Sequence, residues 1–260
     1  MSAKDCQPMV VLSRTLEAEP NMISSDTHLQ IGSLLFEGLD QVDLTGPFEV
    51  LSRIPNSTYR IYGKTGDSVR DIRGLRLTPD ATLAEAPKLD VVHVPGGYGQ
   101  EAMMDDEEIL SWVRHQAQGA TCVFSVCTGA FICGAAGLLK GRRATTHWSA
   151  FALLPIFGAI PVNERVVIDG NMVFAAGVTS GIDGALRVAA NLRGDEVAQS
   201  IQLYMQYAPE PPFNSGTPET APPAVWKGAQ ESVRKMTAQR EQTARRVAQR
   251  LGIVPSAAAS

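Results

Sequence analysis

The sequence predicts an α/β domain in which a mostly parallel sheet is covered by helices on both faces. Two almost wholly apolar runs, Leu89–Val94 and Thr121–Val126, are typical of strands that are buried on both sides. Between them, Ile109, Val113 and Ala117 recur at helical spacing. Strand, helix and strand therefore alternate, and this favours a parallel sheet with functional residues at the carboxyl ends of its strands.

Further strands follow from the same patterns. The stretch His28–Phe36 reads as a first buried strand, and a second is expected near Tyr59–Gly63. Two more, Arg165–Ile168 and Met172–Ala175, flank Asp169-Gly170-Asn171, a turn sequence that predicts a hairpin.

The last third of the chain is expected to be helical, with one extended loop. Thr179 and Ser180 should begin a helix, with Ser180 and Asp183 as a capping pair. Residues 208–223 are rich in Pro, Gly and Thr, which predicts the loop. A final helix should pack its apolar stripe on the domain, while its basic residues, Arg240 among them, face elsewhere. The stripe comprises Val225, Ala229, Val233, Met236, Ala244, Val247 and Leu251.

We expect one catalytic domain at residues 27–208, with a loose extension at residues 1–26 and a loop and packed helix at residues 209–260. A chain of 260 residues, 44% of them hydrophobic, can bury one large core. A net charge of −4 argues against a nucleic-acid partner. The sequence shows neither an apolar run of membrane-spanning length nor a signal peptide, so a cytoplasmic location is expected.

The four cysteines are expected to be free thiols. Cys6, Cys122, Cys127 and Cys133 have spacings that fit neither a redox pair nor a zinc site, so no metal centre is predicted. Cys122 and Cys133 are interpreted as buried core thiols, because free cysteines in a reducing compartment are mostly small hydrophobes.

Cys127 differs because it stands where a buried strand gives way to a helix. Small residues two positions before and after it, Ser125 and Gly129, permit the sharp turn of a nucleophile elbow. A thiol near a helix amino terminus is favoured as the thiolate, which lowers its pKa. The amide of Thr128, together with that of Gly97 from the Pro95–Gly97 loop, would then form an oxyanion hole.

Two residues are candidates for handling protons beside Cys127. Asp43 follows the first strand, although an aspartate at this point is also typical of a helix cap. His147 follows a pair of arginines, but the sequence favours a structural histidine that bonds a backbone carbonyl beside Trp148 over a Cys-His pair. The sequence alone leaves both choices open.

Several stretches together resemble the ThiJ/PfpI branch of the class I glutamine-amidotransferase-like superfamily, with its flavodoxin-like fold. They are DLTGPFEVL, PGG and SVCTGAFICGAAGLLKGRRATTHW, and the resemblance covers about residues 28–208. VNERVVIDGN, TSGID and YAPEPPFNSGTPETAP are similar to the isocyanide hydratases within that branch. The resemblance implies a homodimeric cysteine enzyme that hydrates an isocyanide to an N-substituted formamide without metal or organic cofactor.

Carried over residue by residue, the resemblance makes Cys127 the nucleophile, Asp43 the acid/base carboxylate and Thr128 the polar neighbour. Related peptidases place a histidine directly after the cysteine, and related deglycases use a glutamate from the first helix; neither feature is present here. Two alternatives remain. One is a sensor domain like that of AraC-type regulators, which would need a helix-turn-helix pair. The other is an enzyme of this fold that acts on another small electrophile, such as a glyoxal.

Overall fold

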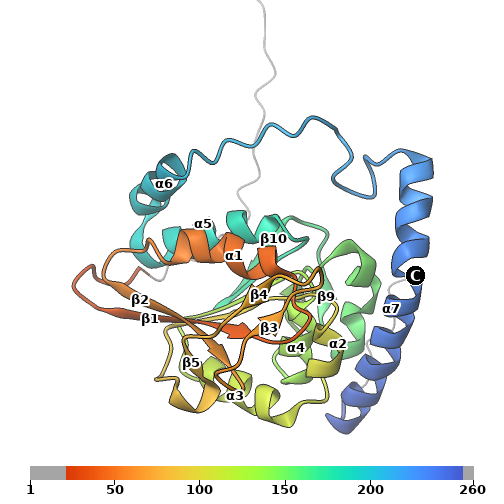
Figure 1. The fold of residues 1–260 in the computed structure, drawn as a ribbon, viewed down its shortest axis with the longest axis horizontal. Coiled ribbons are helices and arrows are strands. Elements are labelled where there is room, and N and C mark those ends of the chain that lie inside the picture. The colour runs from red at the N-terminus through yellow and green to blue at the C-terminus, as the bar shows by residue number, and fades with distance from the viewer. Residues whose placement is uncertain (1–21, 254–260) are drawn as a thin grey trace, which may run out of the picture.

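The computed structural model describes residues 22–253, so most of the expected amino-terminal extension, and Cys6, lie outside the described residues. A seven-stranded sheet forms its centre (Figure 1). In spatial order its strands are β10 (Val166–Asp169), β11 (Met172–Ala175), β7 (Cys122–Val126), β6 (Val91–Val94), β1 (Leu29–Leu35), β2 (Ser57–Gly63) and β5 (Ala81–Thr82). All neighbours are parallel except β10 and β11, which form the expected hairpin. The predicted fold class is confirmed.

Helices cover both faces of this sheet. One face carries α1 (Gln41–Leu51), α5 (Ser180–Arg193) and α6 (Asp195–Tyr204). The other carries α3 (Glu107–Ala117) and α4 (Gly129–Ala135), onto which α2 (Gln100–Met103), the 3₁₀ helix η2 (Trp148–Phe157) and α7 (Pro223–Arg250) pack. Short elements complete the chain: β3 (Val69–Arg70) with β4 (Arg76–Leu77), β8 (Arg143–Ala144) with β9 (Ile160–Pro161), and η1 (Leu83–Glu85).

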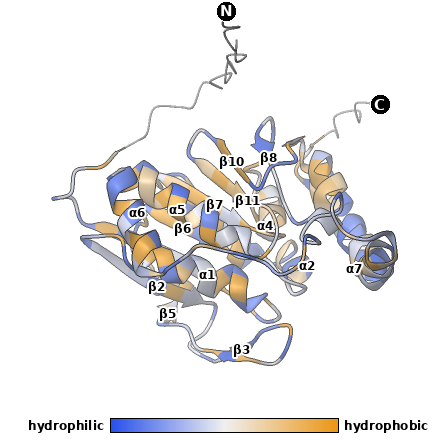
Figure 2. Cartoon of the chain, turned by 90° about the horizontal axis from the view of Figure 1, so that it is seen from above, coloured by the Kyte–Doolittle hydropathy of each residue, from blue (hydrophilic) through white to orange (hydrophobic). Residues whose placement is uncertain are grey.

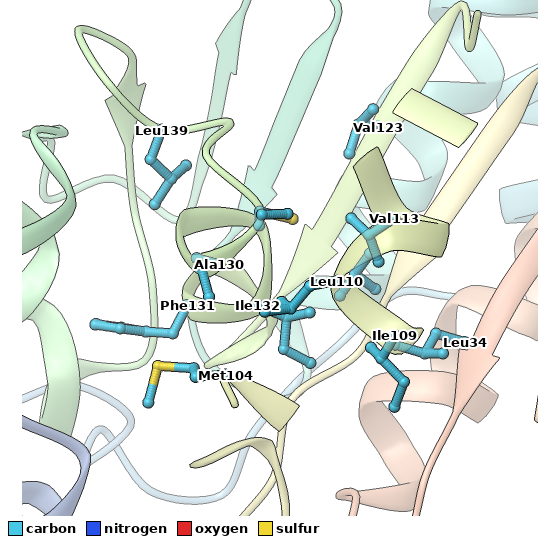
Figure 3. Close-up of a cluster of buried hydrophobic side chains, with 14 of the residues drawn as sticks. Leu34, Met104, Ile109, Leu110, Val113, Val123, Ala130, Phe131, Ile132 and Leu139 are labelled. Carbon is cyan, nitrogen blue, oxygen red and sulfur yellow. The ribbon is translucent and has the colours of Figure 1, made fainter. Parts of the chain in front are cut away.

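The α3 helix illustrates why these segments fold as they do. Asp106 caps its start by accepting a hydrogen bond from the amide of Ile109. Acidic residues fill its first turn and basic ones its last, which suits the helix dipole. Its Ile109 and Val113 are fully buried against Ile132 of α4 and Leu34 of β1 (Figure 3). Burial of each such side chain contributes about 1.5–3 kcal/mol.

One expectation for the α5–α6 region is wrong, and one helix there was not expected. Thr179 precedes α5 without a side-chain cap, and Asp183 instead pairs with Arg165, which the β10–β11 hairpin brings alongside. The hydroxyl of Ser180 donates to the carbonyl of Gly177. The helix α6 was not predicted, because only Ala198 and Ile201 of its ten residues are buried and its apolar pattern is short.

The terminal helix α7 is divided into two unlike halves. Its second half packs on η2, α4 and α2 through Ala244, Val247 and Ala248. The expected packing of the apolar stripe is therefore confirmed only in part: Ala229, Val233 and Met236 in the first half are half-buried, and Val225 is 55% exposed. Arg240 was expected on the outer side, yet only 2% of it is exposed. The chain between α6 and α7 crosses from one end of the molecule to the other (Figures 1 and 2).

Within residues 22–253, no helix combines the length and the apolar composition that crossing a membrane would require. The 28-residue α7 is long enough, but charged residues recur along it.

Candidate active site

Cys127 directly follows β7 in a backbone conformation that few non-glycine residues adopt. Its φ is 56°, in the left-handed region, which costs an L-residue about 1–2 kcal/mol. Surrounding contacts hold this conformation. The Cys127 amide donates to the carbonyl of Ala175 at 3.0 Å, and the Thr146 hydroxyl donates to the Cys127 carbonyl at 2.6 Å. The sharp turn predicted at this position is present.

The loop after β6 lies directly against this turn. A Cβ on Gly96 would lie 2.5 Å from the Thr128 nitrogen, and one on Gly129 would lie 2.1 Å from the Val94 carbonyl oxygen. Both distances are too short for a side chain, so glycine is required for the two backbones to meet. The Thr128 hydroxyl completes the contact, accepting from the Gly97 amide at 3.1 Å and lying 3.2 Å from the Gly97 carbonyl, to which it donates.

Asp43 reaches the same place from α1. Asp40 is the residue that caps this helix, with its side chain accepting from the amide of Val42. Asp43 lies one turn further and is fully buried, so the capping interpretation of Asp43 is wrong. Its Oδ2 accepts from the Gly96 amide at 3.0 Å, and its buried Oδ1 has no hydrogen bond of normal geometry in the described chain.

Burial controls the protonation of Asp43. Desolvation, and then the charge of Asp40, raise the pKa of Asp43 to about 8, while contacts with the Cys127 thiol and the Gly96 amide oppose the rise. The Asp43 carboxyl is therefore largely protonated at neutral pH.

The Cys127 thiol behaves in the same way. Burial and the neighbouring Asp43 raise its pKa well above the ordinary value, and the Thr128 amide only partly offsets this. The lowering expected from a helix amino terminus is therefore outweighed. At rest the site holds two adjacent acids, and both keep their protons at neutral pH.

His93 is a second buried titratable side chain close to Asp43. It is fully buried on β6, and its Nδ1 is 2.6 Å from the Ser33 hydroxyl, which also contacts Tyr59. The other side of the ring faces the backbone of Asp43. Burial lowers the pKa of His93 to about 3, so this ring is neutral and serves as packing rather than as a proton carrier.

His147 begins η2 next to Thr146. Its Nδ1 accepts from the amide of Ser149 at 3.3 Å, so it caps a helix and does not bond a carbonyl as expected. Its ring lies 5.0 Å from that of Trp148, as the sequence suggested. Burial and then the charge of Arg240 lower the pKa of His147 to about 4, which leaves it neutral at pH 7.

Sequence reasoning missed Thr146 and Arg240. Thr146 lies in a stretch that was singled out only for its histidine. Arg240 interrupts the apolar stripe of α7 midway between Met236 and Ala244, four residues from each. A stripe with a charged residue in its centre is the signal that would have revealed a buried arginine.

The described residues show no metal-binding cluster of three or more His, Cys, Asp or Glu side chains, and Cys127 is only 6% exposed. Surface hollows lie on the α5–α6 side. One of about 560 Å³ is lined by Arg53, Glu196 and Tyr204. A thiol with so little exposed surface can be reached only by a small terminal group of a substrate.

A cysteine at a strand-to-helix turn, beside a buried carboxyl from the first helix, places the protein among α/β cysteine proteins. Residues 30–191 match the sequence model of the DJ-1/PfpI family. The chain belongs to the DJ-1/PfpI family.

Individual relatives narrow the comparison. The chain is 47% identical over 225 residues to isonitrile hydratase of Pseudomonas putida, covering 86% of this chain and 99% of that protein. A crystal structure of a ThiJ/PfpI family protein from Pseudomonas syringae superposes with a TM-score of 0.82 at 37% identity, covering 91% of this chain and 97% of that one. The transcriptional regulator GbdR of Pseudomonas aeruginosa is 30% identical over 68% of this chain, which spans only 50% of that regulator.

Proposed function

We propose that the protein is an isonitrile hydratase, a hydro-lyase that converts an isocyanide, R–N≡C, and water into an N-substituted formamide. The observation that carries this is the 47% identity to isonitrile hydratase of Pseudomonas putida over nearly the whole of that protein. The enclosed Cys127 supports it, because the terminal carbon of an isocyanide bears no further substituent. A peptide carbonyl, flanked by chain on both sides, suits this site poorly.

In the proposed first step the Cys127 sulfur attacks the terminal carbon of the isocyanide. A carbon–sulfur bond forms, the carbon gains a proton, and the product is a thioimidate, Cys127–S–CH=N–R. Asp43 takes the thiol proton and supplies the proton that the carbon receives. Its raised pKa supports this role, since the carboxyl is protonated at neutral pH and Oδ1 has no other partner among the described groups.

In the proposed second step water adds to the carbon–nitrogen double bond. One oxygen of the Asp43 carboxyl removes a proton from the water while the other gives its proton to the nitrogen, so Asp43 again ends protonated. The tetrahedral intermediate then collapses, the carbon–sulfur bond breaks, and the formamide leaves as Cys127 regains its proton. All atoms of one water molecule end in the product.

Thr128 and Gly97 have different parts in this proposal. The Thr128 amide faces the Cys127 sulfur and favours its anionic form. The Gly97 amide is already bonded to the Thr128 hydroxyl, so in this conformation it holds the two loops together rather than offering a free donor. Of the two proposed oxyanion donors, the Thr128 amide is the one that faces the reacting atom.

The test is a substrate panel. Purified protein is incubated with alkyl and aryl isocyanides, methylglyoxal and a peptide, and the products are followed by mass spectrometry. Formamides from the isocyanides are expected, and Cys127→Ser should form none. Lactate from methylglyoxal without formamide would favour the glyoxal alternative. No turnover of any substrate would favour a sensor, the role suggested by the similarity to part of GbdR.

We also propose that the protein works as a homodimer through the surface around α6. Leu203, Tyr204 and Phe213 are 82%, 74% and 79% exposed, which is unusual for large apolar side chains. A second copy covering them would bury the kind of surface that stable dimers use. Light scattering should give twice the chain mass, and Leu203→Glu should reduce it. Leu75→Glu, at an exposed leucine on the β3–β4 hairpin, is the matched control. A monomeric wild type would contradict the proposal.

The cytoplasm is the proposed place of action, and residues 27–208 the proposed catalytic unit. Cys122, Cys127 and Cys133 are all free, which suits a reducing compartment. Cell fractionation tests the location. Deletion of residues 209–260 tests the boundary, since a catalytic unit at residues 27–208 should keep its fold and the Cys127–Asp43 pair without them.

A further inference from the structure

We infer that Arg240, delivered by the terminal helix, is the positive charge of the active site and stabilises the anionic sulfur of Cys127. The inference rests on the proposed role of Cys127 as nucleophile. It assigns a positioning and electrostatic role to a residue outside residues 30–191, the segment that matches the family model.

Burial and a hydrogen bond hold the Arg240 side chain in a fixed position. Its side chain is 2% exposed, and its Nε donates to Oε1 of Gln100 at 2.9 Å. Gln100 is itself fully buried at the start of α2, three residues after Gly97. Because the Gly96–Gly97 backbone touches the turn at Cys127, this hydrogen bond joins Arg240 to the same loop that positions the thiol.

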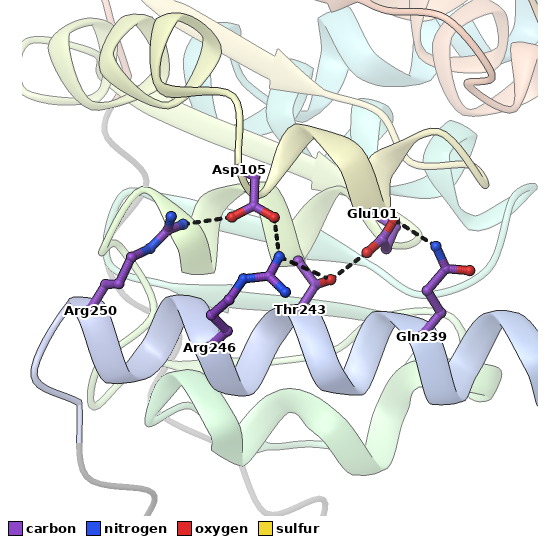
Figure 4. A network of polar contacts seen from close by, with 6 residues as sticks. All are labelled: Glu101, Asp105, Gln239, Thr243, Arg246 and Arg250. Atoms are coloured by element: carbon purple, nitrogen blue, oxygen red, sulfur yellow. Dashed lines mark hydrogen bonds and ion pairs between the residues drawn. The ribbon is translucent and has the colours of Figure 1, made fainter.

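Other side chains of α7 bind α2 and the turn that follows it (Figure 4). Gln239 and Thr243 bond the two carboxylate oxygens of Glu101. Arg246 and Arg250 both pair with Asp105. Glu101 is thus occupied by neutral donors, and Arg240 makes no ion pair within the described part of the chain.

A buried cation without a paired anion is costly, by several kcal/mol before compensation. An anion that forms beside Arg240 during the reaction would compensate this cost. The Cys127 sulfur is that anion in our inference, because the Arg240–Gln100 hydrogen bond places Arg240 at the loop whose Gly96 and Gly97 touch the turn at Cys127. A charge on the sulfur would favour the cationic form of Arg240. Burial itself lowers the pKa of Arg240, and the charges of Cys127, Glu101 and Tyr98 oppose that effect.

The other titratable groups around the thiol do not supply a positive charge. On the side of α1, Asp43 and Asp40 both raise the pKa of Cys127. On the side of η2, His147 is neutral at pH 7, in part because of Arg240 itself. Arg240 is therefore the cation that offsets the acidic surroundings of the sulfur when its proton leaves.

The test measures the Cys127 thiolate directly and needs no isocyanide. Alkylation of Cys127 by neutral iodoacetamide and by anionic iodoacetate is followed by intact mass between pH 6 and 10. The variants are Arg240→Gln, which can still bond Gln100, and Arg240→Lys, which keeps the charge. Arg246→Met is the matched control, because it removes a positive charge from the same helix that does not face Cys127.

Loss of the charge should move the iodoacetamide profile of Arg240→Gln about one pH unit upward, the lower end of the effect of a nearby opposite charge. It should also reduce the preference for iodoacetate over iodoacetamide about tenfold. Arg240→Lys should restore most of both, and Arg246→Met should change neither. An unchanged profile and preference in a folded Arg240→Gln would overturn the inference, as would equal changes in Arg246→Met.

A measurement on the wild type covers the case in which Arg240→Gln does not fold. The ratio of the two alkylation rates at Cys127 is compared with that of free cysteine in the same buffer. If Asp43 and Asp40 dominate the electrostatics of the site, they repel iodoacetate, and the iodoacetate-to-iodoacetamide rate ratio falls below that of free cysteine. This result would contradict the inference. A cation at the active site raises the ratio above that of free cysteine. Because this readout is independent of turnover, failure of the proposed hydratase activity would remain distinguishable.

Discussion

At the carboxyl ends of β6 and β7 two loops meet backbone to backbone, whereas the chain from α6 to the first half of α7 leaves large apolar side chains exposed. In the first region Gly96 and Gly129 leave no room even for a Cβ. In the second, a Cβ on Gly216 would meet nothing within 4 Å. The contrast indicates that the geometry of the active site is fixed by tight backbone contacts within the chain, whereas the outer segment has few contacts that constrain it.

The largest difference between the regions should appear in catalysis at Cys127. Cys127→Ser should abolish turnover with the fold retained, because a serine hydroxyl in so buried a place is a far weaker nucleophile. Cys133→Ser, at another fully buried thiol, should retain turnover. Steady-state rates with an isocyanide, together with circular dichroism, check both. If both variants lost turnover equally, the effect would come from replacing a buried thiol and not from a catalytic role of Cys127.

Asp43→Asn should slow turnover by about 10² to 10⁴, the usual effect of removing an acid/base group. The asparagine can still accept from the Gly96 amide, so the loops should stay in place. Turnover by the wild type should in turn decline as pH rises through about 8, where Asp43 loses its proton. Measured pH–rate profiles decide this, and an Asn variant with wild-type turnover would remove Asp43 from the mechanism.

The crowded loop should be far more sensitive to a single methyl group than the outer segment. Gly96→Ala would force its Cβ against the Thr128 backbone, and overpacking of this kind costs about 1–3 kcal/mol. Gly216→Ala should change the free energy of unfolding by less than about 0.5 kcal/mol. Urea denaturation of both variants tests the contrast, which would be broken if they lost equal stability.

A further expected effect concerns the dependence of stability on pH. The pKa of Asp43 is raised by folding, so the folded state binds the proton more tightly and wild-type stability falls as pH rises from about 4 through about 8. Asp43→Asn lacks this titration. The melting temperature of the variant relative to wild type should therefore increase between pH 5 and pH 9. A constant difference would mean that the Asp43 carboxyl is not destabilised by burial.

Much of the inner region could be predicted from the sequence. Apolar runs of four to six residues located β6, β7 and β11, because strands buried on both faces leave a continuous hydrophobic signal. The turn at Cys127 followed from the small residues around it. The meeting of Gly96 with Thr128 could not be predicted, since it depends on how neighbouring strands pair.

The outer region was harder to predict for a physical reason. The α6 helix buries only two side chains, so its periodicity is faint. In α7 the apolar pattern predicts a helix, but it does not indicate which turns of that helix pack against the rest of the chain. Arg240 illustrates this, since its buried position depends on Gln100, 140 residues away in the chain.

The left-handed backbone of Cys127 has an evolutionary consequence. A glycine at this position would relieve about 1 kcal/mol or more of conformational strain, although it would lose the packing of the side chain. Selection for stability would therefore favour glycine at position 127, whereas selection for the proposed chemistry favours cysteine. If Cys127 is the nucleophile, as proposed, relatives that have lost the activity should show substitutions at position 127 before changes in the surrounding loops.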